Sequence, residues 1–193
     1  APESIIADEM DNGGAANRIA AAFVSARQSA TPIADYPGQI PQSFAQAYAI
    51  QNQAISLFGQ AIAGWKVGRV HEPRAGRWGT PRLAGPIFSD MVVPAQAGSA
   101  VAMPVFAGGF AAVEAELLLR VARPAADPLA MDDQAILSLI DAVHVGIEIA
   151  SSPFPGINAL GPLATASDFG NNAGLVVGPA LPDWRERDLS QVH

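Results

Sequence analysis

Cysteine is absent from the 193-residue sequence. Without thiols, the chain can form no disulfide scaffold, no zinc–thiolate site and no cysteine nucleophile. The N-terminus also lacks the basic region and apolar core of a secretory signal. Both absences agree with a reducing compartment, and we expect a cytoplasmic protein.

Charge is scarce as well, because only 15% of the residues are charged, and the formal net charge is −7. We find no cluster of lysine and arginine, which a nucleic-acid-binding surface needs to neutralise phosphates. The most apolar stretch, residues 100–113, is too short to cross a bilayer and contains proline and glycine. The sequence therefore predicts neither a nucleic-acid partner nor a membrane partner.

Half of the residues are apolar, which allows one packed domain of moderate size. Helical periodicity comes first and strand patterns follow, an order typical of the α+β class with a mixed or curled sheet. We expect helices at 17–28, 43–58 and 132–141, strands at 62–68, 101–106, 113–121, 143–150 and 174–177, and long loops at 71–86 and 151–172. Ser43 is the predicted N-cap of the second helix and Gly59 its stop.

Two glutamates interrupt an apolar strand pattern in the sequence Val113-Glu114-Ala115-Glu116-Leu117. Residues two apart in a strand point to the same face, so Glu114 and Glu116 project together. Adjacent like charges in apolar surroundings are unfavourable unless a cation lies between them, and an oxygen-only set suits Mg²⁺ or Mn²⁺. The alternative is an edge strand with two solvated glutamates.

A third acid, Glu148, lies in another apolar strand pattern, Val145-Gly146-Ile147-Glu148-Ile149. If this strand neighbours the first, its carboxylate completes a set of three ligands and leaves positions open for water and substrate. The alternative is a glutamate that faces outward. Glu114, Glu116 and Glu148 are therefore the candidate metal ligands.

Further polar candidates lie in other segments. Lys66 is the lone cation between the glycines of Gly64-Trp65-Lys66-Val67-Gly68, where an ammonium can approach a carboxylate or an enolate. A surface lysine is the alternative. Asp90, Ser167 and Asp168 are also candidates, although turn or capping roles would explain them equally.

The order of five segments resembles the 2-keto-4-pentenoate hydratase and 4-oxalocrotonate decarboxylase branch of the fumarylacetoacetate hydrolase superfamily. These segments are 64–68, 86–91, 113–117, 147–149 and 167–178, and the resemblance covers about residues 40–190. The resemblance implies helices followed by a mixed, curled β-roll, a bound Mg²⁺ or Mn²⁺, a cytoplasmic location and a homo-oligomer. It also implies a role in the catabolism of aromatic compounds.

Matched position by position, the resemblance assigns a role to each candidate. The metal ligands are Glu114, Glu116 and Glu148, the catalytic residues are Lys66 and Asp90, and the substrate-binding residues are Ser167 and Asp168. The implied organisation is a loose tail over residues 1–14, a helical segment over 15–60 and the β-roll over 61–193.

The sequence departs from the family pattern in three places. The C-terminal strands that close the roll are missing, so we expect an incomplete roll. The family often follows its third ligand with aspartate, serine and arginine, where this chain has Ser151, Ser152 and Pro153. The stretch after Gly68, usually small and hydroxylic, reads Arg69-Val70-His71.

We expect a metal-dependent hydratase that adds water to a 2-hydroxy-2,4-dienoate (2-keto-4-pentenoate) and gives a 4-hydroxy-2-oxo acid. A 4-oxalocrotonate-type decarboxylase would use the same metal chelate as an electron sink, so that alternative stays open. A third alternative is a non-catalytic partner subunit of the same fold, which would form a complex with a hydratase or decarboxylase relative. The changes at Ser151 and Pro153 favour this alternative, and the retention of three glutamates argues against it.

Overall fold

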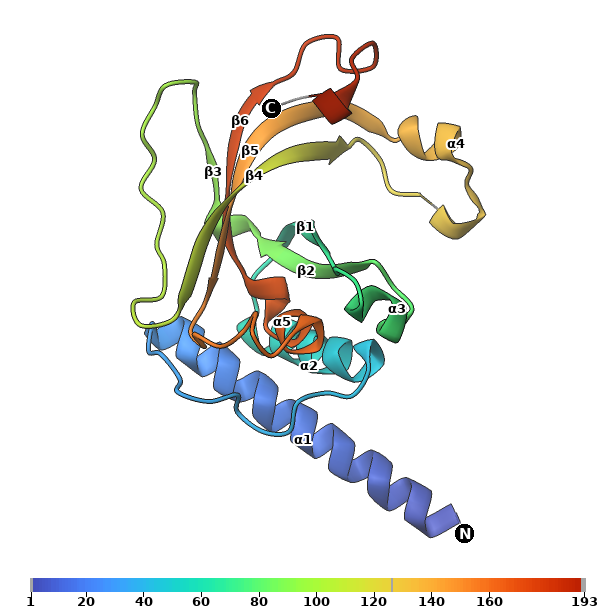
Figure 1. The fold of residues 1–193 in the computed structure, drawn as a ribbon, viewed down its shortest axis with the longest axis vertical. Helices are drawn as coiled ribbons and strands as arrows, with labels where there is room; N and C mark the ends of the chain where they lie inside the picture. Colours follow the sequence, from blue (N-terminus) through green and yellow to red (C-terminus); the bar gives the residue numbers. More distant parts are fainter. Residues whose placement is uncertain (1, 126, 192–193) are drawn as a thin grey trace.

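The computed structural model describes residues 2–125 and 127–191 (Figure 1). Two helices come first and strands follow, with short helices between them. The elements are α1 (Pro2–Ser29), α2 (Phe44–Phe58), β1 (Ile62–Arg69), α3 (Arg74–Trp78), β2 (Arg82–Phe88), η1 (Ser89–Met91), β3 (Val92–Pro94), β4 (Phe110–Val121), η2 (Pro128–Ala130), α4 (Asp133–Leu137), β5 (Ile140–Ser152), α5 (Pro162–Ser167), η3 (Phe169–Asn171), β6 (Asn172–Ala180) and η4 (Leu189–Gln191).

Helix α2 begins and ends where the sequence predicts. The Ser43 side chain accepts a hydrogen bond from the Gln46 backbone N–H at 3.2 Å, which satisfies a free donor of the first turn. Gly59 ends the helix in the left-handed region, with φ of 71°, and its N–H donates to the Ile55 carbonyl. Helix α1 begins at Pro2 rather than at residue 17, so residues 2–14 of the expected loose tail are helical, while residue 1 lies outside the described residues.

The main core lies between the first two helices and the strands. Phe23 of α1 and Phe169 of η3 are almost fully buried in it. Phe88 at the end of β2 packs edge-on against Phe169, with 5.0 Å between the ring centroids. These contacts hold the β1–β2 pair and the beginning of β6 on the helical layer, as Figure 1 shows.

Two sheets make up the strand portion of the described residues. β1 and β2 form an antiparallel pair, and the second sheet has the order β3-β6-β5-β4, with β3 parallel to β6 and the other pairs antiparallel. In Figure 1 the long strands β4, β5 and β6 curve over the β1–β2 pair. The α+β class is confirmed, whereas the closed roll and its missing strands stay predictions.

Three segments differ from the sequence prediction. The predicted loop at 71–86 contains α3 and most of β2. Pro86 is compatible with β2 because the sheet has only two strands, so each strand has a free edge. The predicted loop at 151–172 contains α5 and η3. The predicted helix at 132–141 is shortened to α4, since β5 already begins at Ile140.

The predicted strand at 101–106 is wrong, because these residues form no regular structure. Met103 and Val105 instead line a groove on the sheet together with Ile147 and Val176. A short apolar run covers a sheet face here, and periodicity alone does not separate such a run from a strand. None of the described helices is both long and apolar enough to cross a membrane.

Candidate metal centre

The three predicted metal ligands converge on one face of the curved sheet. Glu114 of β4 lies directly opposite Glu148 of β5 in the antiparallel register, and Glu116 follows two residues later on the same face. One carboxylate oxygen from each residue lies within 4.8 Å of the other two. Glu148 is buried at 2% exposure, while Glu114 is half-buried. The sheet therefore forms a compact cluster of three carboxylates.

The electrostatics of this cluster favour a bound cation. Burial raises the pKa of Glu116, the negative charges of Glu148 and Glu114 raise it further, and the positive charge of Lys66 opposes the increase. The raised pKa means that the third negative charge is disfavoured in the metal-free protein. Three carboxylates with no sulfur or nitrogen ligand fit a hard divalent cation such as Mg²⁺.

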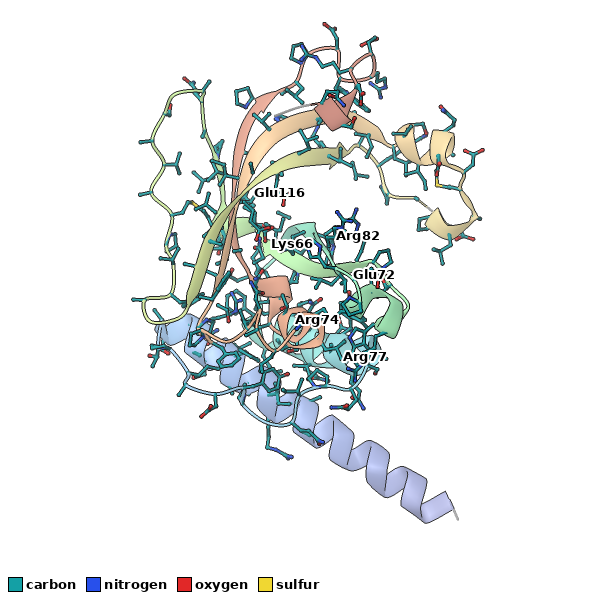
Figure 2. The ribbon with its side chains drawn as sticks, viewed as in Figure 1. Lys66, Glu72, Arg74, Arg77, Arg82 and Glu116 are labelled. Atoms are coloured by element: carbon teal, nitrogen blue, oxygen red, sulfur yellow. The ribbon has the colours of Figure 1, made fainter. Side chains whose placement is uncertain are left out.

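Two side chains, those of Lys66 and Asn172, donate to the Glu148 carboxylate. The Lys66 ammonium lies 3.1 Å from Glu148 Oε1, and the Asn172 side-chain amide donates to the same oxygen at 3.0 Å. The Lys66 side chain is only 8% exposed. Lys66 of β1 also acts electrostatically on Glu116 of β4, and Figure 2 labels both residues. Both donors use Oε1, and no hydrogen bond of the other Glu148 oxygen is found within the described residues.

Two glycines allow β1 to approach this cluster. A side chain at Gly85 of β2, the cross-strand neighbour of Lys66, would collide with the Phe169 carbonyl. Gly170 has φ of 62°, and a β-carbon there would lie 2.9 Å from the Lys66 side chain. The β1–β2 pair therefore rests directly on η3, and Lys66 passes over Gly170 to reach Glu148.

The remaining sequence candidates do not join the cluster in the same way. Asp90 is exposed on η1, and no hydrogen bond or ion pair of its side chain is found in the described part of the chain. Ser167 and Asp168 are buried, and their side chains bind Tyr36, Arg27 and Ser152. The contacts of Ser167 and Asp168 with substrate stay predictions. Lys66, in contrast, contacts Glu148, one of the predicted metal ligands.

Sequence reasoning missed Asn172, which contacts Glu148, and Arg27, which contacts the Asn172 backbone at 2.9 Å. Arg27 lies in the last turn of α1, far from the motifs in the sequence. Asn172 lies within the 167–178 segment, but nothing in its spacing marks its side chain as a contact of Glu148, and a helix arginine carries no spacing signal. Only the fold brings them next to β5.

No protein-family model matches the sequence, and no curated protein sequence matches it. Solved structures do match. One is 4-oxalocrotonate decarboxylase from Pseudomonas putida G7 complexed with magnesium and adipate, with a TM-score of 0.66 at 19% identity. This chain has the fold of that decarboxylase. The alignment covers 90% of this chain and 66% of the decarboxylase chain.

A second structure of the same decarboxylase, complexed with calcium and acetate, gives a TM-score of 0.66 at 18% identity. That alignment covers 90% of this chain and 65% of the other. The chain thus spans just under two thirds of the length of the decarboxylase. The resemblance to the decarboxylase and hydratase branch is confirmed at the level of the fold.

Proposed function

We propose that the chain is a divalent-metal-dependent lyase of the 2-keto-4-pentenoate hydratase and 4-oxalocrotonate decarboxylase branch. The observation that carries the proposal is the convergence of Glu114, Glu116 and Glu148 on a fold shared with a decarboxylase solved with magnesium. Mg²⁺ or Mn²⁺ is the proposed cofactor. We further propose a cytoplasmic homo-oligomer, in line with the sequence resemblance.

The preferred reaction is hydration of a 2-hydroxy-2,4-dienoate. A proton added at C5 and a proton lost from the 2-hydroxyl give a 2-oxo-3-enoate. Water then adds its hydroxide to C4 and a proton to C3, giving a 4-hydroxy-2-oxo acid. A bound divalent cation would supply positive charge for the carboxylate and the 2-oxygen of the substrate.

The side chains of the chain itself hold and orient the reacting groups. The Lys66 ammonium fixes Oε1 of Glu148 and adds positive charge beside the place where enolate charge develops. Asp90 stays the proposed acid–base residue on the strength of the resemblance alone. Ser167 and Asp168 stay proposed substrate contacts on the strength of the resemblance alone, because both side chains are buried and bound to other residues of the chain.

Decarboxylation of a dicarboxylate such as 4-oxalocrotonate is the second candidate. Arg69 and Arg82 lie directly opposite each other on β1 and β2, both are exposed, and neither forms an ion pair within the described residues. Like charges opposite one another are unfavourable in a sheet, and an anionic group near them would relieve the repulsion. Because Arg69 is three residues from Lys66, this pair lies on the opposite face of β1 from Lys66, and the decarboxylase candidate rests instead on the fold shared with a 4-oxalocrotonate decarboxylase.

Turnover of two substrates tests the proposal. The protein is freed of metal with EDTA, and loss of dienoate absorbance is followed with and without added Mg²⁺, in parallel with CO₂ release from 4-oxalocrotonate. Mg²⁺-dependent turnover of the dienoate supports the hydratase, and CO₂ release supports the decarboxylase. Mg²⁺ binding without either turnover would support the non-catalytic partner subunit, whereas metal-independent turnover would contradict the proposal.

A further inference from the structure

A buried ion pair joins Arg27 of α1 to Asp168, which lies shortly before β6. Arg27 Nε lies 2.6 Å from Asp168 Oδ1 and one terminal nitrogen lies 3.0 Å from Oδ2, with side-chain exposures of 5% and 0%. The Ser152 hydroxyl donates to Asp168 Oδ2 at 2.6 Å. Burial of two charges has a large desolvation cost, so such a pair is weak evidence of a purely stabilising role.

The remaining donors of Arg27 bind the backbone of two strands. The terminal nitrogen that does not contact the Asp168 carboxylate donates to the Asn172 carbonyl at 2.9 Å, and the one that contacts Oδ2 also lies 3.3 Å from the Ser151 carbonyl, to which it donates. The rings of Phe106 and Phe169 also contact the guanidinium, with centroids at 5.4 and 5.0 Å. Arg27 therefore fixes the end of β5 and the beginning of β6 together.

This fixation acts where the sheet is irregular. The pairing of β5 with β6 shifts register between Ile149 and Ala150, and Ala150 pairs with Asn172. A register shift leaves the strand ends less determined by the ladder of backbone hydrogen bonds. Arg27 supplies the missing constraint, and Asn172, placed by it, donates its side-chain amide to Glu148 Oε1 at 3.0 Å.

We infer that Arg27 and Asp168 are positioning residues that act through Asn172 on the orientation of Glu148, and that this orientation tunes both the affinity and the choice of the metal ion. The inference rests on the proposed metal site. Mg²⁺ demands near-ideal octahedral geometry, whereas Ca²⁺ accepts varied geometries with six to eight ligands. Loss of the fixed orientation should therefore weaken Mg²⁺ binding more than Ca²⁺ binding.

The test compares calorimetric affinities for Mg²⁺ and Ca²⁺ in the wild type, in Asn172→Leu, in the double variant Arg27→Met/Asp168→Asn, and in the triple combination. The double variant removes both buried charges together, so no unpaired charge remains. Asn172→Leu keeps the ion pair and removes only the amide donor to Glu148. The control is Arg120→Met/Asp141→Asn, which removes an exposed ion pair that joins β4 to β5 away from the ligands.

The expected result is a loss of Mg²⁺ affinity of about 10- to 100-fold in Asn172→Leu and in the double variant, as for other residues that orient metal ligands. The loss for Ca²⁺ should be smaller, and the triple variant should be no weaker than Asn172→Leu alone, because both changes act on one path. The control should bind both ions as the wild type does. Melting curves of every variant establish that each is folded.

Wild-type Mg²⁺ affinity in folded Asn172→Leu, an equal loss for both ions, or additive losses in the triple variant would overturn the inference. A wild type that binds no Mg²⁺, or Mg²⁺ binding that survives Glu116→Gln, would instead overturn the proposed metal site, and the inference with it. The two failures are therefore distinguishable.

Discussion

Glu114 and Glu148 lie directly opposite each other on β4 and β5, so two carboxylates occupy a cross-strand position at which like charges repel. Glu116 brings a third negative charge to the same face. An arrangement that lowers stability without a ligand and can bind a cation is typical of functional sites.

Glu116→Gln should stabilise the metal-free protein at neutral pH while it impairs metal binding. The folded-state pKa of Glu116 is raised above the ordinary value of 4.5, so its contribution to stability is fully present below about pH 4.5 and is lost as the pH rises through the raised pKa. Glutamine has no such loss. Urea unfolding in EDTA should show that the variant gains more free energy of unfolding over the wild type at pH 7 than at pH 4. An equal gain in free energy at both pH values would contradict the prediction.

Tyr36 should produce a second, alkaline pH dependence. Burial, with the nearby negative charge of Asp168, raises its pKa to about 12 against the hydrogen bond with Ser167, which lowers it. Because the folded pKa is higher than the ordinary 10.0, the stability from this group is present below pH 10 and is lost between about pH 10 and 12. Tyr36→Phe should flatten the fall in melting temperature over this range. An unchanged slope would contradict the raised pKa of Tyr36.

The buried ion pair should be far more sensitive to single substitution than the exposed one. Arg27→Met leaves the Asp168 carboxylate buried without its cation, which typically costs about 3–5 kcal/mol of unfolding free energy. Arg120→Met breaks the exposed pair with Asp141, and solvent screening should keep its effect close to experimental error. Chemical denaturation measures both. Similar losses for the two variants would contradict the burial of the Arg27–Asp168 pair.

Two glycines on the β1–β2 pair provide a matched test of close packing. A β-carbon at Gly85 would collide with the Phe169 backbone, whereas one at Gly64 meets no atom within 4 Å. Gly85→Ala should therefore destabilise the protein by about 3 kcal/mol, the upper end of the range for overpacking, and Gly64→Ala should be tolerated. Comparable melting temperatures for the two variants would show that β2 does not rest on η3.

The sequence predicts the local features of the metal site and of α2 because both depend on neighbours in the chain. The two-residue spacing of Glu114 and Glu116 is sufficient to place them on one face of a strand. Ser43 and Gly59 mark helix ends by hydrogen bonds to residues three or four positions away. The strand that carries Glu148 is also recognisable from its apolar pattern.

The features that the sequence does not predict depend on long-range pairing. That Glu148 lies opposite Glu114 is a matter of strand register over a separation of 34 residues, and the contact of Arg27 with Asp168 spans 141 residues. The family resemblance, and not the local sequence, assigns Asp168 to substrate binding. In the fold it is paired and buried, and only the tertiary structure reveals the partner.

Calorimetric titration of Mg²⁺ into the metal-free protein, with and without oxalate as a chelating mimic of a 2-oxo acid, would show whether the three carboxylates bind a metal ion. We predict binding of one ion per chain, a higher affinity in the presence of oxalate, and loss of binding in Glu116→Gln. Absence of Mg²⁺ binding by the folded wild type, or binding that Glu116→Gln leaves unchanged, would contradict the claim that Glu114, Glu116 and Glu148 form a metal site.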